Sequence, residues 1–508
     1  MKRRAVSFVS LFVLLSSIFG VLALPASPVR ADVRIEELTA AQALERMEKG
    51  ELTSVRYVSA LLDRADKLQD LNVFISRQER QTLLEEAWQA DLRRFFCKPH
   101  GRLDGLPIIV KDNINSADLP TTAGTPALFS NQPSQNAAVL QKLLEEGAIL
   151  IGKANMHELA FGVTCNNPAT GAVHNPYDFT MIPGGSSGGT AAAIAARIVP
   201  VGLGTDTAGS VRVPAALSGT YGFHPSADRY SRDGIVLISN TQDRVGTMAR
   251  SVRDLVLLDT ILSDQGSHVH AVPLRGLRLG VDRANFVSNV DPAVSTLFEA
   301  ALEKLERHGV TIVDVSVMQP TDFAATIAAL RFSVGFYEAP INLTDYFQNM
   351  QPPLTLLDVA NQIASPDVRG IFFKFFVPGA PLAVTPQAYQ AGLAARDTLR
   401  NAYVNVMQAA RIDGMIFPTT LLPARPIGQD VTVTLNGQQF PTTLIYSQNV
   451  VPGSYAGLAG LSLPIGLTDD GLPVGLELDG LEGSDETVLG IGLSLEQAFG
   501  HLPAPTLP

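Results

Sequence analysis

Two glycine-rich turns that carry serine lie close together in the sequence and offer the side chains best suited to nucleophilic chemistry. The first reads Gly-Gly-Ser-Ser-Gly-Gly over residues 184–189, and the second reads Gly-Thr-Asp-Thr-Ala-Gly-Ser over residues 204–210. Because glycine has no Cβ atom, the backbone can approach a bound molecule closely at both turns. Hydroxyls and backbone N–H groups can therefore face one spot, and we expect the chemistry there.

A serine hydroxyl becomes a good nucleophile only when a neighbouring base removes its proton. Residues 182–214 contain no histidine, so the base must come from another part of the chain. Upstream, the apolar run Pro107–Val110 reads as a short buried strand and ends in Lys111. Loss of hydration at such a strand end would lower the pKa of the lysine toward the neutral amine that a base requires. Lys111 is therefore the candidate base.

Strand and helix patterns alternate around these turns, which predicts an α/β fold with a sheet covered by helices on both faces. Asn436-Gly437 after an apolar run further predicts a tight hairpin. Apolar runs predict strands at 107–111, 148–152, 201–204, 277–281, 311–317 and 472–478. Helical periodicity predicts helices within 35–69 and at 136–147, 187–198, 251–262, 292–308 and 484–499.

Residues 324–399 differ from the rest, because aromatic side chains are frequent and prolines interrupt the pattern. Two interpretations stay open: the aromatic residues line a substrate channel, or they pack a local core. The aromatic residues that raise this question include Phe332, Phe336, Tyr337, Phe372, Phe373, Phe375 and Phe376.

The N-terminus has the layout of a secretory signal peptide: Lys2 to Arg4 are basic, residues 5–24 are apolar, and Val29-Arg30-Ala31 follows as the exit, with small residues at its two ends. We expect cleavage after Ala31, export to the periplasm or the extracellular space, and no stable membrane insertion afterwards. The alternative is a retained single-span anchor, since about 20 apolar residues can cross a bilayer. Residues 32–508 then form the mature chain.

The chain is acidic, with a net charge of -11, and loss of the four basic residues in 1–31 would take the mature chain to -15. Nucleic acid and anionic membranes are therefore excluded as favoured partners. The two cysteines, Cys97 and Cys165, leave open a disulfide or two free thiols. Neither has the spacing of a metal ligand, so no metal is expected.

Three segments partly match familiar functional motifs, but the residues around each one exclude that function. Residues 147–154 nearly spell a phosphate-binding loop, but the intervening residues are an apolar strand run and Ala154 lacks the required hydroxyl. Lys153 within it reads as a strand-end surface lysine without a role. The Gly-x-Ser-x-Gly pattern at 184–188 follows a loop and not the strand of a nucleophile elbow. His157-Glu158 has no second histidine four residues on, which excludes a zinc-protease helix.

Three segments taken together resemble the amidase signature family: residues 184–189, residues 204–214 and Val110-Lys-Asp-Asn113. The resemblance continues to Gly471–Gly475 and covers essentially the whole mature chain, 32–508, as one amidase domain. It implies the family's fold, a single large mixed β-sheet with helices on both faces. Flanking residues 162–167, 175–177 and 221–223 most resemble the bacterial arylacetamide amidases, of the indoleacetamide and mandelamide hydrolase type.

The resemblance also implies the roles of particular residues. Ser210 is the expected nucleophile, Ser186 the bridging serine after a cis peptide bond, and Lys111 the base. Backbone N–H groups of Thr207, Ala208, Gly209 and Ser210 would form the oxyanion hole. The family usually has glycine where this chain has Ala208, which still supplies an N–H if the turn does not need a positive φ. Ser187, Asp206 and Arg212 are expected in supporting roles.

The resemblance implies an exported amidohydrolase that cleaves non-peptide carboxamides, with an apolar or aryl acyl group, to carboxylate and ammonia or amine. No cofactor is expected, and the partner is a small-molecule amide. Three alternatives stay open: an amidotransferase-type subunit, an esterase, and a catalytically silent binding protein of the same fold. The sequence also leaves the oligomeric state open, a homodimer included.

Overall fold

The computed structural model describes residues 34–263 and 266–507. The expected signal peptide, residues 1–31, lies outside the described residues, so its cleavage or retention stays a prediction. Within the described part of the chain, none of the helices combines the length and the apolar character needed to span a bilayer.

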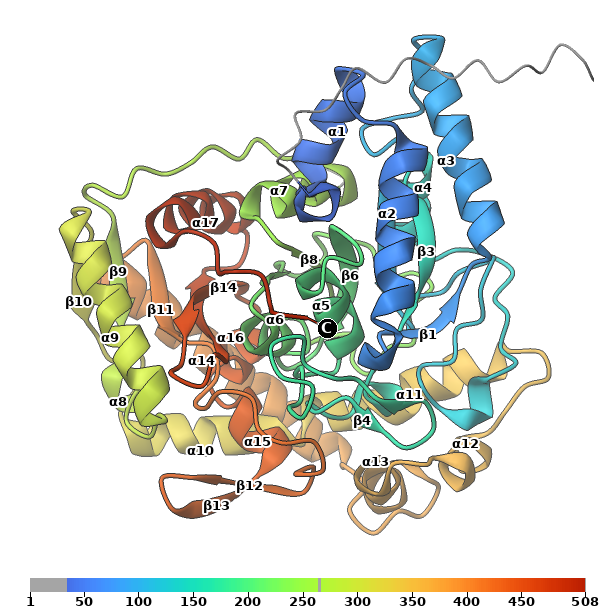
Figure 1. The fold of residues 1–508 in the computed structure, drawn as a ribbon. Helices are drawn as coiled ribbons and strands as arrows, with labels where there is room; N and C mark the ends of the chain where they lie inside the picture. The colour runs from blue at the N-terminus through green and yellow to red at the C-terminus, as the bar shows by residue number, and fades with distance from the viewer. Residues whose placement is uncertain (1–33, 264–265, 508) are drawn as a thin grey trace, which may run out of the picture.

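One mixed sheet of eleven strands runs through the molecule (Figure 1) and confirms the predicted fold class. Toward one edge, β2 is parallel to both β3 and β6, whereas β6 is antiparallel to β8. In spatial order the strands are β1 (Phe74–Arg77), β3 (Ile149–Ala154), β2 (Pro107–Lys111), β6 (Val201–Asp206), β8 (Arg244–Ala249), β7 (Tyr221–His224), β14 (Ala459–Leu467), β15 (Pro473–Gly480), β11 (Gly414–Pro418), β9 (Arg278–Val281) and β10 (Thr311–Asp314).

Helices cover both faces of this sheet, as the alternation of side chains along β2 shows. Ile108 and Val110 belong to one hydrophobic cluster, and Ile109 between them belongs to another. The first cluster is covered by α1 (Ala40–Glu48), α4 (Ala138–Glu145), α7 (Val252–Leu262), α9 (Pro292–Arg307) and α17 (Asp485–Phe499). The second is covered by α2 (Ser54–Lys67), α3 (Arg80–Phe95) and α5 (Gly188–Ala195).

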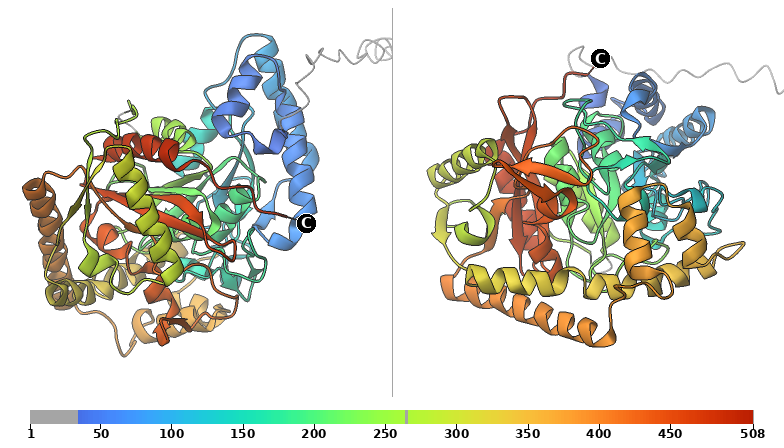
Figure 2. Two further views of the ribbon diagram at one scale, coloured as in Figure 1. Left: turned by 60° about the vertical axis from the view of Figure 1, so that its left-hand side comes forward. Right: turned by 90° about the horizontal axis from the view of Figure 1, so that it is seen from below.

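The aromatic segment is helical and follows the lower side of the molecule in Figure 1. Phe372 and Phe376 are buried in a hydrophobic cluster of their own, so the local-core interpretation is confirmed for them. Phe332 is 44% exposed. The helices are α10 (Pro320–Arg331), α11 (Val334–Gln348), α12 (Leu356–Gln362), α13 (Pro366–Ile371), the π-helical turn η5 (Phe372–Phe376) and α14 (Pro386–Ala410), which lies alongside α10 in Figure 2.

The predicted hairpin is also present, as β12 (Thr432–Leu435) and β13 (Gln438–Pro441). Its two turn residues, Asn436 and Gly437, have φ values of 50° and 77°, as a tight hairpin turn requires. The smaller elements are η1 (Ile35–Glu37), η2 (Gln69–Leu71), η3 (Pro126–Leu128), η4 (Glu158–Ala160), β4 (Asn166–Asn167), β5 (Gly171–Ala172), α6 (Arg212–Ser218), α8 (Arg283–Phe286), α15 (Thr442–Ser447) and α16 (Val451–Ala456).

Candidate active site

Lys111 is the last residue of β2, and its side chain is fully buried. Because side chains alternate along a strand, Lys111 shares the face of Ile109, the face on which α5 packs. Its Nζ atom lies 2.7 Å from Ser186 Oγ and 2.8 Å from Thr205 Oγ1. The structure therefore brings the candidate base into hydrogen-bonding contact with the first serine turn.

The pKa of Lys111 is lowered to about 7, and the cause is burial. The charges of Asp206 and Asp243 oppose this effect and keep the pKa from falling further. Near neutral pH a large fraction of the side chain is thus the neutral amine, which has a lone pair available to accept a proton.

The Ser186 turn is held by its own backbone. The Gly185–Ser186 peptide bond is cis, and the Ser186 carbonyl accepts hydrogen bonds from His157 N at 3.2 Å and Cys165 Sγ at 3.3 Å. A Cβ atom at Gly185 would lie 2.9 Å from the backbone of Val163, closer than real side chains come. Glycine is therefore required here because another chain segment lies directly against the turn.

Ser210 lies in the loop between β6 and α6 and is 8% exposed. Its carbonyl accepts a hydrogen bond from Ser187 N at 3.2 Å, which ties the two serine turns together. The two turns are therefore joined through the backbone. Among the described residues, the hydroxyls of Ser186 and Ser210 form no hydrogen bond with each other. Ser187 Oγ donates to the Thr205 carbonyl at 3.3 Å and does not cap α5.

The expected oxyanion-hole donors differ in their availability. Gly209 N donates to Asp206 Oδ1 at 2.6 Å, so this amide already has an acceptor inside the loop. Gly209 also has a φ of 110°, whereas Ala208 is not among the described residues with a positive φ. Alanine therefore fits at position 208 without strain. The roles of Thr207 and Ala208 as donors stay predictions.

Asp206 and Arg212 form a fully buried ion pair, with Arg212 Nε 3.1 Å from Asp206 Oδ2. Burial alone would raise the pKa of Asp206, but the charges and hydrogen bonds of Arg212 and His224 together outweigh it and hold the pKa well below its usual value. Asp206 also accepts a hydrogen bond from Val211 N at 3.1 Å, and Arg212 Nη1 donates to Glu477 at 3.0 Å. The pair therefore fixes the Ser210 loop on the strands beneath it.

Four residues near β2, Thr205, Asn113, Asp112 and Lys153, make contacts that the sequence did not predict. Thr205 accepts from both Lys111 and Asn113 Nδ2, the latter at 3.0 Å. The interpretation of Lys153 as a surface lysine is wrong: it is fully buried, with Nζ 3.2 Å from Asp112 Oδ1. The only sequence signal was that Asp112 and Lys153 each lie at or just after the end of a predicted strand, and neighbouring parallel strands bring such positions together.

The two cysteines are free thiols in the structure, Cys97 exposed and Cys165 buried. Burial raises the pKa of the Cys165 thiol to about 11, so it is protonated beside the Ser186 turn at neutral pH. Among the described residues, no group of three His, Cys, Asp or Glu side chains is placed to hold a metal ion.

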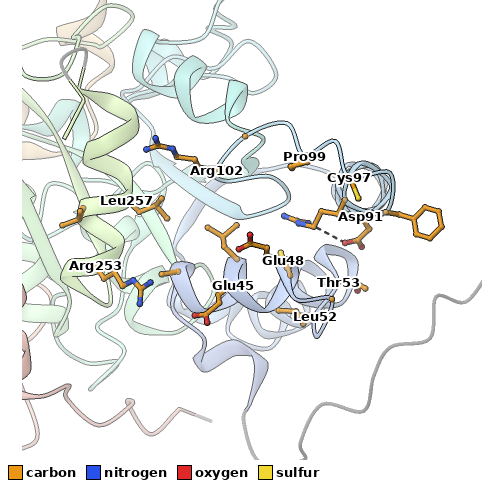
Figure 3. A pocket seen from close by; sticks show the side chains of 18 residues that line it. Glu45, Glu48, Leu52, Thr53, Asp91, Cys97, Pro99, Arg102, Arg253 and Leu257 are labelled. Atoms are coloured by element: carbon orange, nitrogen blue, oxygen red, sulfur yellow. Dashed lines mark ion pairs between the residues drawn. The ribbon is translucent and has the colours of Figure 1, made fainter. Parts of the chain in front are cut away.

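A cavity of about 1100 Å³ lies elsewhere, between α1, α3 and α7 (Figure 3). Its walls include Glu48, Phe95 and Arg253, and neither serine turn contributes to it. We therefore do not place the substrate in this cavity.

The chain is similar to known proteins over most of its length. The Amidase family profile matches residues 56–489. The chain is 40% identical to an indoleacetamide hydrolase of Agrobacterium vitis, over 92% of this chain and 98% of that protein. It is 38% identical to a mandelamide hydrolase of Pseudomonas putida, over 92% and 93% of the two chains. The crystal structure of a peptide amidase from Stenotrophomonas maltophilia superposes with a TM-score of 0.76 at 29% identity, covering 93% and 99% of the two chains.

These matches define the class of the protein, a hydrolase that acts on amide bonds. The chain belongs to the amidase signature family and is an amidase.

Proposed function

We propose that this amidase hydrolyses small non-peptide carboxamides to carboxylate and ammonia or amine through Ser210, Ser186 and Lys111. The observation that carries the proposal is the 2.7 Å contact between Lys111 Nζ and Ser186 Oγ. The Lys111 amine is buried, and burial lowers its pKa to about 7. Such an amine can accept a proton at neutral pH without a histidine.

In the first half of the reaction, neutral Lys111 takes the proton of the Ser186 hydroxyl while Ser186 takes the proton of Ser210. The Ser210 oxygen attacks the amide carbon, and the carbonyl oxygen becomes an oxyanion. Protonated Lys111 then returns its proton through Ser186 to the leaving nitrogen, and the carbon–nitrogen bond breaks. Water repeats the same steps on the acyl-enzyme and releases the carboxylate.

The oxyanion would be stabilised by the backbone N–H groups of Thr207 and Ala208, together with that of Ser210. A single donor of this kind contributes about 3–4 kcal/mol to the transition state. Gly209 is left out because its N–H donates to Asp206. In this proposal Asp206 and Arg212 orient the loop and take no part in proton transfer.

The acyl group is proposed to be apolar or aryl. Phe161 follows the Ser186-contacting residue His157 by four positions, and its ring lies 5.4–6.4 Å from the rings of Phe336, Phe372 and Phe376. Phe161, Phe372 and Phe376 are buried, whereas Phe336 is only partly buried and is the ring of this cluster that can offer an aryl group edge-to-face contact. The relatives named for indoleacetamide and mandelamide support the same substrate class.

A panel of primary amides, anilides and esters, offered to the purified chain without residues 1–31, tests the proposal by the product released. We expect arylacetamides to be hydrolysed fastest, and Ser210→Ala to abolish turnover. Hydrolysis of esters with no turnover of any amide would overturn the substrate class.

We also propose that the protein is exported, on the strength of the basic start, the apolar run 5–24 and the small-residue exit at Ala31. Sequencing the N-terminus of the native protein tests this. A mature N-terminus at Asp32 is expected, and a cytoplasmic protein that retains Met1 would contradict export.

A further inference from the structure

The dipeptide His157-Glu158 has no part in the proposed proton transfer, yet it lies directly behind the Ser186 turn. His157 is 2% exposed, and its backbone N–H donates a hydrogen bond to the Ser186 carbonyl at 3.2 Å. The backbone position of the bridging serine therefore depends on where His157 lies.

The imidazole of His157 is fixed by three surrounding groups. Nε2 lies 3.3 Å from Oδ2 of Asp367, which is on α13, and Nδ1 lies 3.4 Å from Thr164 Oγ1. Thr164 in turn donates to Asp430 Oδ1 at 2.7 Å. A Cβ atom at Gly162 would overlap the ring, so the ring is packed against the backbone there. It cannot move without moving the chain around it.

Glu158 holds the two residues that lead into the same helix. Its side chain is fully buried and accepts hydrogen bonds from Ala364 N at 3.1 Å and Ser365 N at 2.7 Å. These amides immediately precede α13. Two consecutive residues thus fasten the start of α13, one through Asp367 and one through the backbone.

From α13 the chain continues directly into η5, which carries part of the aromatic cluster. The rings of Phe372 and Phe376 lie 5.8 Å and 5.4 Å from the ring of Phe161. The five residues 157–161 therefore contact the Ser186 carbonyl at one end and the aromatic cluster at the other. These five residues thus contact the α13–η5 segment, residues 366–376, near its start at Asp367 and near its end at Phe372 and Phe376.

We propose that His157 is a positioning residue that couples the seating of the α13–η5 segment to the placement of Ser186. The inference rests on the proposed function, in which the aromatic cluster contacts the acyl group of the substrate. An aryl group bound there contacts the α13–η5 segment and fixes its position. Through the His157–Asp367 contact, the position of this segment in turn fixes the position of the Ser186 turn. His157 exchanges no proton with the substrate.

Kinetics of His157→Ala, Asp367→Ala and the double variant test the coupling, with phenylacetamide and acetamide as substrates. Because misplacement of a catalytic group by about 1 Å can cost about 10²-fold in rate, we expect each single variant to lower kcat for phenylacetamide by up to about 10²-fold with little change in KM. The double variant should lose no more than the worse single variant. Acetamide, which cannot reach the aromatic cluster, should be affected far less.

Conservative and control variants separate positioning from general damage. Asp367→Asn keeps an acceptor for the imidazole and should recover part of the lost kcat even if His157→Ala does not fold. Asp345→Asn makes the same change at an exposed residue of α11 and should leave kcat unchanged. Equal losses on both substrates, or multiplicative losses in the double variant, would overturn the coupling.

Failure of the inference is distinct from failure of the proposed function. If the unaltered protein hydrolyses phenylacetamide and the variants match its kcat, the coupling is wrong and the function stands. If the unaltered protein hydrolyses neither amide, the proposed function falls. The rate at which a fluorophosphonate probe labels Ser210 then decides the coupling, since His157→Ala should slow labelling and an unchanged rate would overturn it.

Discussion

At the scale of single residues, Lys111 is subject to two opposing effects. Loss of hydration favours its neutral form, whereas the charges of Asp206 and Asp243 favour the protonated form. The first effect is larger, and the pKa is lowered to about 7. A pKa in this range suits a general base that works at neutral pH, because both forms are populated during each turnover.

The pH dependence of kcat/KM should follow this pKa. Below about pH 7 the amine is protonated and cannot accept a proton, so kcat/KM should rise about tenfold per pH unit and level off above pH 7. Lys111→Arg, whose guanidinium stays protonated, should lose activity by orders of magnitude at every pH. Rates measured from pH 5 to pH 9 check this, and a flat profile in the unaltered protein would contradict it.

The buried pair of Lys153 and Asp112 gives a prediction about stability. Lys153→Met leaves the Asp112 carboxylate buried without its partner and should lower the free energy of unfolding by about 3–5 kcal/mol. Adding Asp112→Asn removes the unpaired charge and should restore part of the loss. Urea unfolding measures both, with the exposed Lys374→Met as the control. A loss below about 0.5 kcal/mol for Lys153→Met would show that the pair does not matter.

Sequence reasoning succeeded at residues whose surroundings are local and failed where partners are distant. Lys111 could be placed because the apolar run before it already predicts a buried strand. Lys153 was misread because its partner Asp112 directly follows the neighbouring strand β2, about 40 residues away in the sequence. The contact of Arg212 with Glu477 spans 265 residues, so no local pattern could reveal it. The bond from Gly209 to Asp206 is local but depends on the exact loop conformation.

At the scale of elements, the same distinction between local and distant partners separates the elements that could be predicted from those that could not. β2 was predicted with its observed bounds and α5 to within three residues at each end, because an apolar run or a helical period lies within a single segment. β14 was not predicted, since Pro464 and two glycines interrupt it and Pro464 lies at a break in register with β15. Its existence depends on pairing with β7 and β15, which are distant in sequence.

Strand β15 carries two buried carboxyl groups, Glu477 and Asp479, against the single guanidinium of Arg212. Burial raises the pKa of Asp479 to about 7, although Arg212 opposes the shift. Between about pH 4 and pH 7 the folded state therefore holds a proton that the unfolded state has lost. Stability should fall as pH rises through this window, by up to about 1.4 kcal/mol per pH unit.

Asp479→Asn should weaken this dependence, because the amide does not titrate, whereas Glu477, whose pKa burial also raises, keeps part of it. Free energies of unfolding in urea, measured from pH 4.5 to pH 8, should converge for the two proteins at low pH and diverge as pH rises, with the variant relatively more stable above pH 7. Parallel curves would mean that another group holds the proton.

At the scale of the whole molecule, the site draws on strands and loops from Lys111 to Glu477. Residues 1–31 are the proposed signal peptide, whose cleavage would leave the exported enzyme without them, so removing them should leave kcat unchanged. Kinetics of the full-length and shortened chains on the same amide check this. A folded but inactive shortened protein would show that the N-terminal residues contribute to the site.

The central claim is that Ser210 is the nucleophile and that Lys111 activates it through Ser186. Peptide mapping by mass spectrometry after reaction with a fluorophosphonate at pH 8 tests it most directly. The account predicts a single adduct on Ser210, formed in the unaltered protein and slowed by orders of magnitude in Lys111→Ala. An adduct on another residue, or labelling of Lys111→Ala at the unaltered rate, would contradict it.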